Sequence, residues 1–256
     1  MEDAVALVTG AAGGIGAAVA GALARRGTPV AAVDRDAGRL AEVTGRMAAE
    51  GLPVTAFPAD VTRAAEVAEL VDAVERTLGP VDRLVNAAGV LHLSPVRRLT
   101  DEDWAATFAV NTTGVMNVSR AVVDRMVPRG RGAIVTVASN AAGTPRTEMA
   151  AYAASKAAAT MFTKCLGLEV ARYGIRCNVV APGSTDTAML RSMWHDETGP
   201  RATIDGRPEA YKVGIPLGKL ARPADIADAV VFLLSEQAGH ITLHDLTVDG
   251  GATLGV

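Results

Sequence analysis

The chain has 256 residues, of which 49% are hydrophobic and 21% charged, with a net charge of −3 at pH 7. A nucleic-acid-binding domain usually shows a clustered basic face, and this mild acidic balance argues against one. No apolar run reaches the roughly 18–20 residues of a membrane span. The N-terminus, MEDAVALVTG, lacks the basic start and long apolar stretch of a secretory signal. We therefore expect a cytoplasmic protein that binds neither nucleic acid nor membrane.

Short apolar runs alternate along the chain with segments of helical period. The runs lack polar alternation, which is typical of strands buried on both faces of a parallel sheet. In residues 64–78 the apolar side chains share one helix face, and Gly79-Pro80 ends that helix. The alternation predicts an α/β sheet with right-handed crossovers in a single domain, residues 1–256. The expected strands are 4–8, 29–33, 54–57, 83–85, 133–137, 176–180 and 246–248.

Residues 184 to about 212 show no clear period and contain Gly199, Pro200, Gly206 and several charges. Long loops of compact domains often cover a binding site, although a plain surface excursion fits this composition equally well. We expect this segment to form a substrate lid.

The first expected strand runs into a glycine-rich turn, TGAAGGIG, and a helical segment follows it. Glycines let the backbone turn sharply and approach a pyrophosphate held at a helix N-terminus. Asp34 ends the next strand, where its carboxylate can accept hydrogen bonds from the adenosine ribose and repel a 2′-phosphate. Arg35 beside it could pair with such a phosphate, which keeps NADP open. On balance the sequence favours NAD.

Tyr152 and Lys156 are four residues apart, so both side chains lie on one face of a helix. A tyrosine titrates near ~10, and a nearby ammonium favours the phenolate and lowers that pKa. Tyr152 is therefore a candidate general base for a hydroxyl proton. Ser139 follows the strand 133–137, where its hydroxyl could hold the substrate oxygen beside Tyr152.

Together these motifs resemble the short-chain dehydrogenase/reductase family, and the resemblance covers nearly the whole chain. It is carried by Thr9-Gly10-x-x-x-Gly14-x-Gly16, Asn86-Ala87-Ala88-Gly89, Asn111, Ser139, Tyr152-x-x-x-Lys156 and Pro182-Gly183. The resemblance implies a Rossmann-type doubly wound parallel sheet of about seven strands flanked by helices. It also implies hydride transfer to a nicotinamide cofactor and a homotetrameric assembly.

The resemblance also implies roles for individual residues. Tyr152 would be the base, Lys156 would tune it and bind ribose, and Asn111 would anchor the water of a proton relay. The implied catalytic set is Asn111, Ser139, Tyr152 and Lys156. The implied cofactor-binding residues are Gly10, Gly14, Ile15, Gly16, Asp34, Asp60, Val61, Asn86, Ala87, Gly89, Tyr152, Lys156, Pro182, Gly183 and Thr187.

Further stretches resemble family members that oxidise a dihydrodiol carboxylic acid to the catechol acid of siderophore synthesis. These stretches are ASNAAGTPR, RCNVVAPGSTDTAM, GIPLGKLARP and GHITLHDLTVDGGATLGV. An arginine fork binds a carboxylate bidentately, so we expect Arg146 to hold that group, with Arg191 as its rival. Met189 fits either contact with the ring or packing of the lid. The expected substrate-binding residues are Ser139, Arg146, Tyr152, Met189 and Arg191.

Other functions remain open at this point. An amino analogue of the same ring carries its hydroxyl at the same carbon and would suit the same residues. A ketoreductase for carrier-bound β-keto chains would prefer NADPH and a basic entrance, which Asp34 and the acidic balance disfavour. A cofactor-binding regulator without turnover would not need the complete catalytic set. The histidines show no zinc-ligand spacing, so we expect no metal site; they are His92, His195, His240 and His244.

Overall fold

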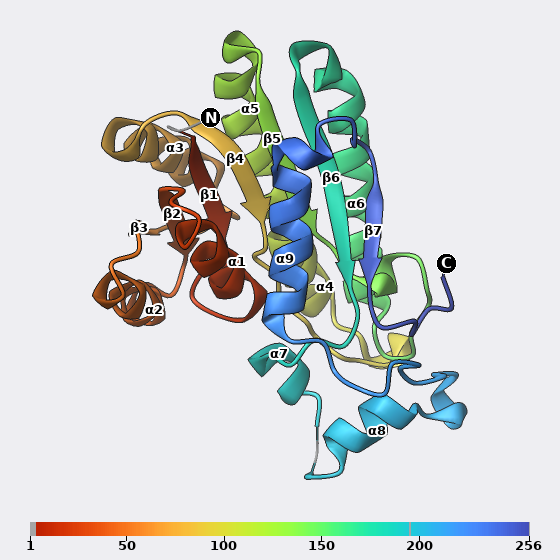
Figure 1. The fold of residues 1–256 in the computed structure, drawn as a ribbon. Helices are drawn as coiled ribbons and strands as arrows, with labels where there is room; N and C mark the ends of the chain where they lie inside the picture. Colours follow the sequence, from red (N-terminus) through yellow and green to blue (C-terminus); the bar gives the residue numbers. More distant parts are fainter. Residues whose placement is uncertain (1–3, 195, 256) are drawn as a thin grey trace.

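Seven parallel strands form one sheet in the computed structural model, which describes residues 4–194 and 196–255. The strand order is β3-β2-β1-β4-β5-β6-β7 (Figure 1). Strands β2 and β3 are added on one side of β1 and strands β4 to β7 on the other, so the switch point of the sheet lies between β1 and β4. Each expected run overlaps a strand, which confirms the predicted fold class. The strands are β1 (Val5–Thr9), β2 (Val30–Asp34), β3 (Val54–Pro58), β4 (Val81–Asn86), β5 (Gly132–Val137), β6 (Ile175–Pro182) and β7 (Asp245–Val248).

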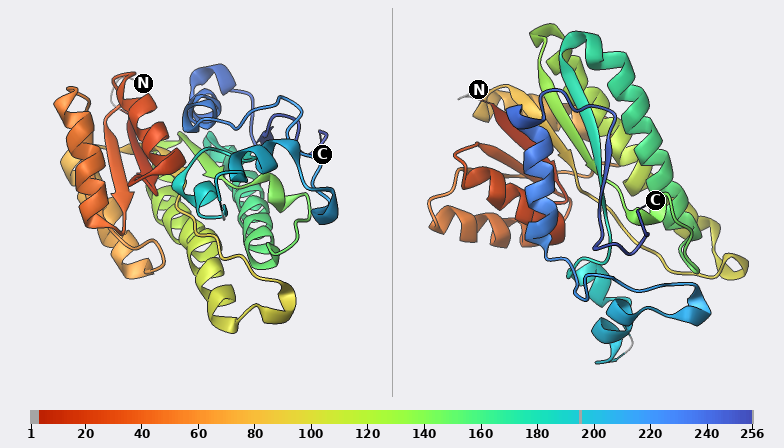
Figure 2. Two further views of the ribbon diagram at one scale, coloured as in Figure 1. Left: turned by 90° about the horizontal axis from the view of Figure 1, so that it is seen from below. Right: turned by 45° about the vertical axis from the view of Figure 1, so that its right-hand side comes forward.

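Helices cover both faces of the sheet (Figure 2). One layer consists of α1 (Gly14–Ala24), α2 (Ala37–Ala49) and α9 (Pro223–Leu234). The opposite layer consists of α3 (Ala64–Leu78), α5 (Val115–Arg129) and α6 (Ala150–Val170), and α4 (Asp101–Phe108) packs beside α6. A π-helical turn, Ala109–Gly114, joins α4 to α5.

The central strand shows why the apolar runs do not alternate with polar residues. In β1, Ala6 and Val8 face the core under α1 and α9, while Val5 and Leu7 face the core under α3 and α5. All four side chains are completely buried. Because helices cover both faces, the carboxyl edge of the sheet is where a ligand can bind.

The segment between β6 and α9 lies beyond the carboxyl ends of the strands (Figure 1). It is not a featureless loop, since it contains α7 (Ala188–Arg191), α8 (Gly199–Asp205) and a 3₁₀ turn at Pro208–Ala210. His195 belongs to this segment and lies outside the described residues. Within the described ranges, no helix is both long and apolar enough to cross a membrane.

Candidate active site

The turn between β1 and α1 leaves no room for a side chain at Gly10 or Gly16. Gly10 and Gly14 have φ angles of 70° and 56°, in the left-handed region that favours glycine. A Cβ on Gly16 would lie 2.2 Å from the Gly10 carbonyl oxygen, and one on Gly10 would lie 2.7 Å from that of Ala87. The turn ends at the first residue of α1, whose free N–H groups suit a phosphate. This cradle fits the pyrophosphate of a dinucleotide.

Thr9 fastens this turn to the end of β4. Its hydroxyl accepts hydrogen bonds from the backbone N–H of Ala87 at 3.1 Å and of Ala88 at 3.2 Å. Asn86 points away from the cradle, because its side-chain amide donates to Ser119 Oγ at 2.9 Å inside the core. Ala87, in contrast, lines the cavity described below. In this arrangement the Asn86 side chain stabilises the loop that follows β4, and only the backbone of Asn86 would be able to contact a cofactor.

Asp34 ends β2, and Asp60 follows the neighbouring strand β3. Asp34 Oδ2 accepts from Ala12 N–H at 3.1 Å, so the carboxylate rests against the glycine turn. Asp60 accepts from the backbone N–H and the hydroxyl of Thr62, at 2.9 and 2.8 Å. Burial raises the pKa of Asp60, but these hydrogen bonds and the charge of Arg35 outweigh it and hold the pKa below its usual value.

Ser139, Tyr152 and Lys156 converge at the carboxyl end of β5. Ser139 follows that strand, its hydroxyl accepts from Ala141 N–H at 3.1 Å, and it hydrogen-bonds the Tyr152 phenol. Lys156 donates from Nζ to the Val137 carbonyl at 2.9 Å, and Nζ lies 5.9 Å from the centre of the Tyr152 ring. The serine, the phenol and the amine therefore meet as the spacing predicts.

The expected lowering of the tyrosine pKa is wrong for this state of the protein. Burial raises the pKa of Tyr152 above its ordinary value, and the hydrogen bond with Ser139 offsets only part of that effect. Burial also lowers the pKa of Lys156 to about 8. Both groups are shielded from water, which disfavours the phenolate and the ammonium alike.

Asn111 lies completely buried in the π-helical turn. Its side-chain amide donates to the Val90 carbonyl and to Ser155 Oγ, each at 3.0 Å, and its oxygen accepts from Val90 N–H at 2.8 Å. Both amide donors are thus used in joining the loop after β4 to α6. A Cβ on Gly89 would lie 3.4 Å from both Asn111 Oδ1 and Lys156 Nζ, so this glycine lies against the two side chains.

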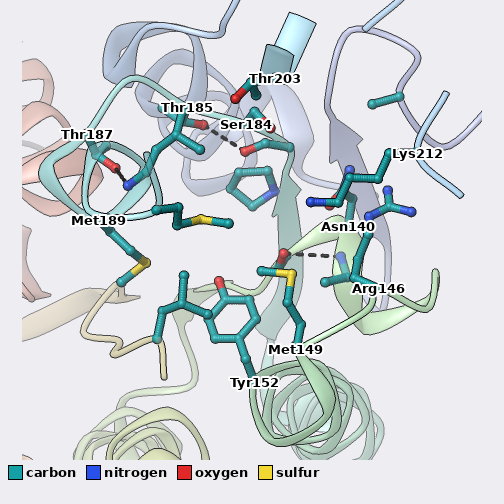
Figure 3. A pocket seen from close by; sticks show the side chains of 18 of the residues that line it. Asn140, Arg146, Met149, Tyr152, Ser184, Thr185, Thr187, Met189, Thr203 and Lys212 are labelled. Atoms are coloured by element: carbon teal, nitrogen blue, oxygen red, sulfur yellow. Dashed lines mark hydrogen bonds between the residues drawn. The ribbon is translucent and has the colours of Figure 1, made fainter. Parts of the chain in front are cut away.

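A cavity of about 490 Å³ opens above Tyr152, between the sheet edge and segment 184–212 (Figure 3). Residues expected for cofactor or substrate line it: Ile15, Ala87, Gly89, Ser139, Arg146, Tyr152, Lys156, Pro182, Gly183, Thr187 and Met189. Thr187 also caps α7 by accepting from Leu190 N–H at 3.3 Å. Its methyl group would lie 3.4 Å from a Cβ on Gly14, so segment 184–212 meets the cradle at this point.

The two candidate arginines differ in position. Arg146 is partly exposed and lines the cavity, where burial lowers its pKa. Arg191 binds the Asp186 carboxylate with Nε at 2.8 Å and Nη2 at 3.1 Å, and its side chain is exposed. Arg191 does not line the cavity, which argues against its expected contact with substrate.

Several residues that line the cavity were not predicted from the sequence, including Asn140, Met149, Arg207 and Lys212. Asn140 directly follows Ser139 and donates to Asp249 Oδ2 at 3.2 Å, which ties the site to the C-terminal turn. Arg207 and Lys212 come from the far end of segment 184–212 and had no motif to reveal them. Within the described ranges, no cluster of three or more histidine, cysteine, aspartate or glutamate side chains could hold a metal ion.

The arrangement is one that known proteins share. Residues 4–198 match the family model for short chain dehydrogenases. The chain is a short-chain dehydrogenase. The enzyme is 59% identical over 256 residues to the 2,3-dihydro-2,3-dihydroxybenzoate dehydrogenase of Bacillus subtilis, covering all of this chain and 98% of that one. It is 49% identical to the Escherichia coli enzyme of the same name over 191 residues, 73% of this chain and 77% of that one.

Solved structures agree with this assignment of the short-chain dehydrogenase. A gluconate 5-dehydrogenase from Burkholderia cenocepacia, crystallised with NADP and tartrate, superposes with a TM-score of 0.91 at 32% identity. The match covers all of this chain and 97% of that one. The protein is therefore an oxidoreductase with a Rossmann-type fold that uses a nicotinamide cofactor.

Proposed function

We propose that this dehydrogenase oxidises the C3 alcohol of trans-2,3-dihydro-2,3-dihydroxybenzoate with NAD. The resulting ketone then tautomerises to 2,3-dihydroxybenzoate. The observation that carries the proposal is the partly exposed Arg146 in the same cavity as Tyr152, in a chain 59% identical over its full length to a dehydrogenase named for this substrate. The cavity thus offers a cation for the carboxylate and a phenol for the alcohol.

Tyr152 would take the proton of the C3 hydroxyl, while Ser139 holds the substrate oxygen. NAD held in the glycine cradle would accept the hydrogen of C3 as hydride, and the positive charge of its ring would favour the phenolate of Tyr152. The buried Lys156 ammonium lies 5.9 Å from the centre of the Tyr152 ring, so its charge would also favour the phenolate. The C2 proton of the ketone is then lost and a proton returns to the C3 oxygen, which makes the ring aromatic.

The preference for NAD rests on Asp34. Its carboxylate lies against the glycine turn, 3.1 Å from Ala12 N, and each oxygen still has a lone pair for a ribose hydroxyl. A 2′-phosphate there would meet a like charge, which disfavours NADP. Arg35 also carries a positive charge here, and that charge acts on the nearby carboxylate of Asp60.

Residues 184–212 would serve as the lid of this site. Met189, Trp194 and Thr203 of this segment line the cavity that Tyr152 faces. Closing apolar side chains over the ring would exclude water from the proton transfer. Limited proteolysis tests this role, because a bound dinucleotide and substrate analogue should protect the segment. Equal cleavage with and without ligands would contradict it.

We also propose that the enzyme is a homotetramer in the cytoplasm. The outward face of α6 supports assembly, since Met161 and Leu168 are 60% and 72% exposed on the helix that carries Tyr152. Apolar side chains exposed in this way are typical of subunit interfaces. Light scattering of the purified protein gives the mass directly, and a monomer of 26.2 kDa would contradict the proposal.

Arg146→Met tests how the carboxylate is held. Hydrogen bonds to charged groups are worth about 1.5–3 kcal/mol, so KM for the acid should rise by about 10–100-fold with a smaller change in kcat. Arg191→Met serves as the comparison, and its KM should stay near that of the wild type because Arg191 lies outside the cavity. An unchanged KM in Arg146→Met would discard this assignment.

The substrate itself is tested by comparison with trans-2,3-dihydro-3-hydroxyanthranilate, which has an amino group in place of the C2 hydroxyl. Turnover of the diol with little turnover of the amine supports the proposed function. Faster turnover of the amine would keep the chemistry and change the substrate.

A further inference from the structure

Lys212 enters the cavity from the far end of segment 184–212, on the same side as Arg146 (Figure 3). Its backbone is fixed by two hydrogen bonds with Arg207, from Arg207 N to Lys212 O at 2.9 Å and from Lys212 N to Arg207 O at 3.0 Å. Behind this small hairpin, a Cβ on Gly206 would lie 2.4 Å from Gly214 N. This tight backbone packing fixes the position of the Lys212 backbone, from which the side chain extends into the cavity.

The positive charges in this part of the cavity differ in their pairing, and Arg207 Nε lies 2.9 Å from Glu209 Oε1. Among the described residues, neither Arg146 nor Lys212 forms an ion pair. Burial and the positive charges of Arg146 and Arg207 lower the pKa of Lys212, and Glu148 only partly offsets this. Glu148 is an exposed side chain, so water screens its charge.

Asp249 is the other acidic group close to Arg146, and its oxygens are already engaged. They accept from Asn140 Nδ2 at 3.2 Å, from Gly251 N–H at 2.9 Å and from the Thr253 hydroxyl at 2.7 Å. Asp196 also lines the cavity, and its Oδ1 accepts from the Thr198 N–H at 2.8 Å and from the Thr198 hydroxyl at 2.6 Å. Among the described residues, neither of the two neighbouring cations has a carboxylate as an ion-pair partner, and such a cavity wall favours a ligand that brings a negative charge.

We propose that Lys212 is a second ligand of the substrate carboxylate, which would bridge Arg146 on the core and Lys212 on the lid. This inference rests on the proposed function and adds a residue that determines specificity. The attraction of two cations would compensate for the free-energy cost of removing one carboxylate from water. A neutral diol would leave both positive charges without a negative partner. Binding of the acid would also hold the lid against the core, because the two cations belong to different parts of the chain.

Kinetics of Lys212→Met with two substrates test the inference. The first substrate is trans-2,3-dihydro-2,3-dihydroxybenzoate, and the second is the cyclohexadiene trans-diol that lacks the carboxylate. KM for the acid should rise about tenfold or more with kcat within about twofold of the wild type, while kcat/KM for the neutral diol stays unchanged. Lys212→Arg should recover most of the loss. Lys219→Met is the matched control, since Lys219 is exposed and outside the cavity.

Two outcomes of these kinetics would overturn the inference. One is an unchanged KM for the acid in Lys212→Met. The other is an equal loss for the acid and the neutral diol, which would mean that Lys212 only supports the fold of the lid.

Equilibrium binding separates this inference from the proposed function. Calorimetry compares 2,3-dihydroxybenzoate with catechol, and the wild type should bind the acid more tightly. In Lys212→Met the ratio of the affinity for the acid to the affinity for catechol should be about tenfold smaller than in the wild type. This result is expected whether or not the dihydrodiol acid is turned over. A wild type that fails to oxidise the dihydrodiol acid overturns the proposed function alone. A preference that is the same in Lys212→Met and wild type overturns the role of Lys212.

Discussion

Replacing Lys156 by methionine should make the protein more stable at neutral pH while it abolishes activity. The lysine is only 5% exposed, and burial lowers its pKa from 10.5 to about 8. Each pKa unit corresponds to about 1.36 kcal/mol, so keeping the ammonium inside the folded protein costs about 3 kcal/mol. Methionine is unbranched and apolar and fills similar space without that cost.

The gain is partly offset by a lost hydrogen bond. Lys156 donates to the Val137 carbonyl at 2.9 Å, and such a bond contributes about 1 kcal/mol. The net stabilisation is therefore about 2 kcal/mol at pH 7. For a chain of this length, each kcal/mol of stabilisation raises the melting temperature by about 2–4 °C. The melting temperature of Lys156→Met should therefore be roughly 4–8 °C higher than that of the wild type.

The advantage of Lys156→Met should depend on pH in a definite direction. The pKa of Lys156 is lower in the folded protein, about 8, than the 10.5 expected for the unfolded chain. Between these values the folded state has released a proton that the unfolded state keeps, so wild-type stability rises with pH. Methionine does not titrate, and its advantage should shrink from pH 8 toward 10.5.

Urea unfolding of both proteins at pH 7 and pH 10, at one protein concentration, measures this difference directly. A higher midpoint for Lys156→Met at pH 7 and a smaller gap at pH 10 would support the reasoning. A methionine variant that is less stable than the wild type at pH 7 would refute it, because burial would then not be the dominant effect on the lysine.

Two substitutions and one assay of the unchanged protein test the cofactor site and the direction of the reaction. Gly16→Ala places a Cβ 2.2 Å from the Gly10 carbonyl oxygen, so fluorescence titration should show NADH affinity reduced about tenfold or more, and normal affinity would contradict the cradle. Asp34→Ser removes the charge beside Ala12, so the ratio of kcat/KM for NAD over NADP should fall about tenfold or more, and an unchanged ratio would assign the preference elsewhere. With 2,3-dihydroxybenzoate and NADH, absorbance at 340 nm should stay constant, because reduction would break the aromatic ring; a clear decrease would contradict the aromatisation step.

The fold was predictable because parallel strands covered on both faces must be apolar throughout. The residues at which the strands begin and end were harder to predict from the sequence. β6 continues to Pro182 because Ala181 and Pro182 pair with Thr247 and Val248 of β7, and that pairing depends on a partner far along the chain. Helix α3 was predicted from Ala64 to Leu78 and is observed there, because its apolar stripe and the stop at Gly79 are local signals.

The site was predictable where its geometry is local. Tyr152 and Lys156 share a helix face because of their spacing, and the glycine turn follows from steric needs within a few residues. The pKa of Tyr152 was not predictable, because the direction depends on burial that only the assembled fold reveals. Arg191 was expected in the cavity, although its partner Asp186 is close in sequence. Lys212 had no signal at all, since only the path of the lid brings it to Arg146.

The most direct test of the proposed function is NADH formation at 340 nm with trans-2,3-dihydro-2,3-dihydroxybenzoate, run in parallel with NAD and with NADP. We expect rapid turnover of the diol acid with NAD and little with NADP. Absence of turnover on the diol acid, in a protein that still binds NADH, would contradict the proposed substrate while leaving the dehydrogenase fold and its tyrosine chemistry in place.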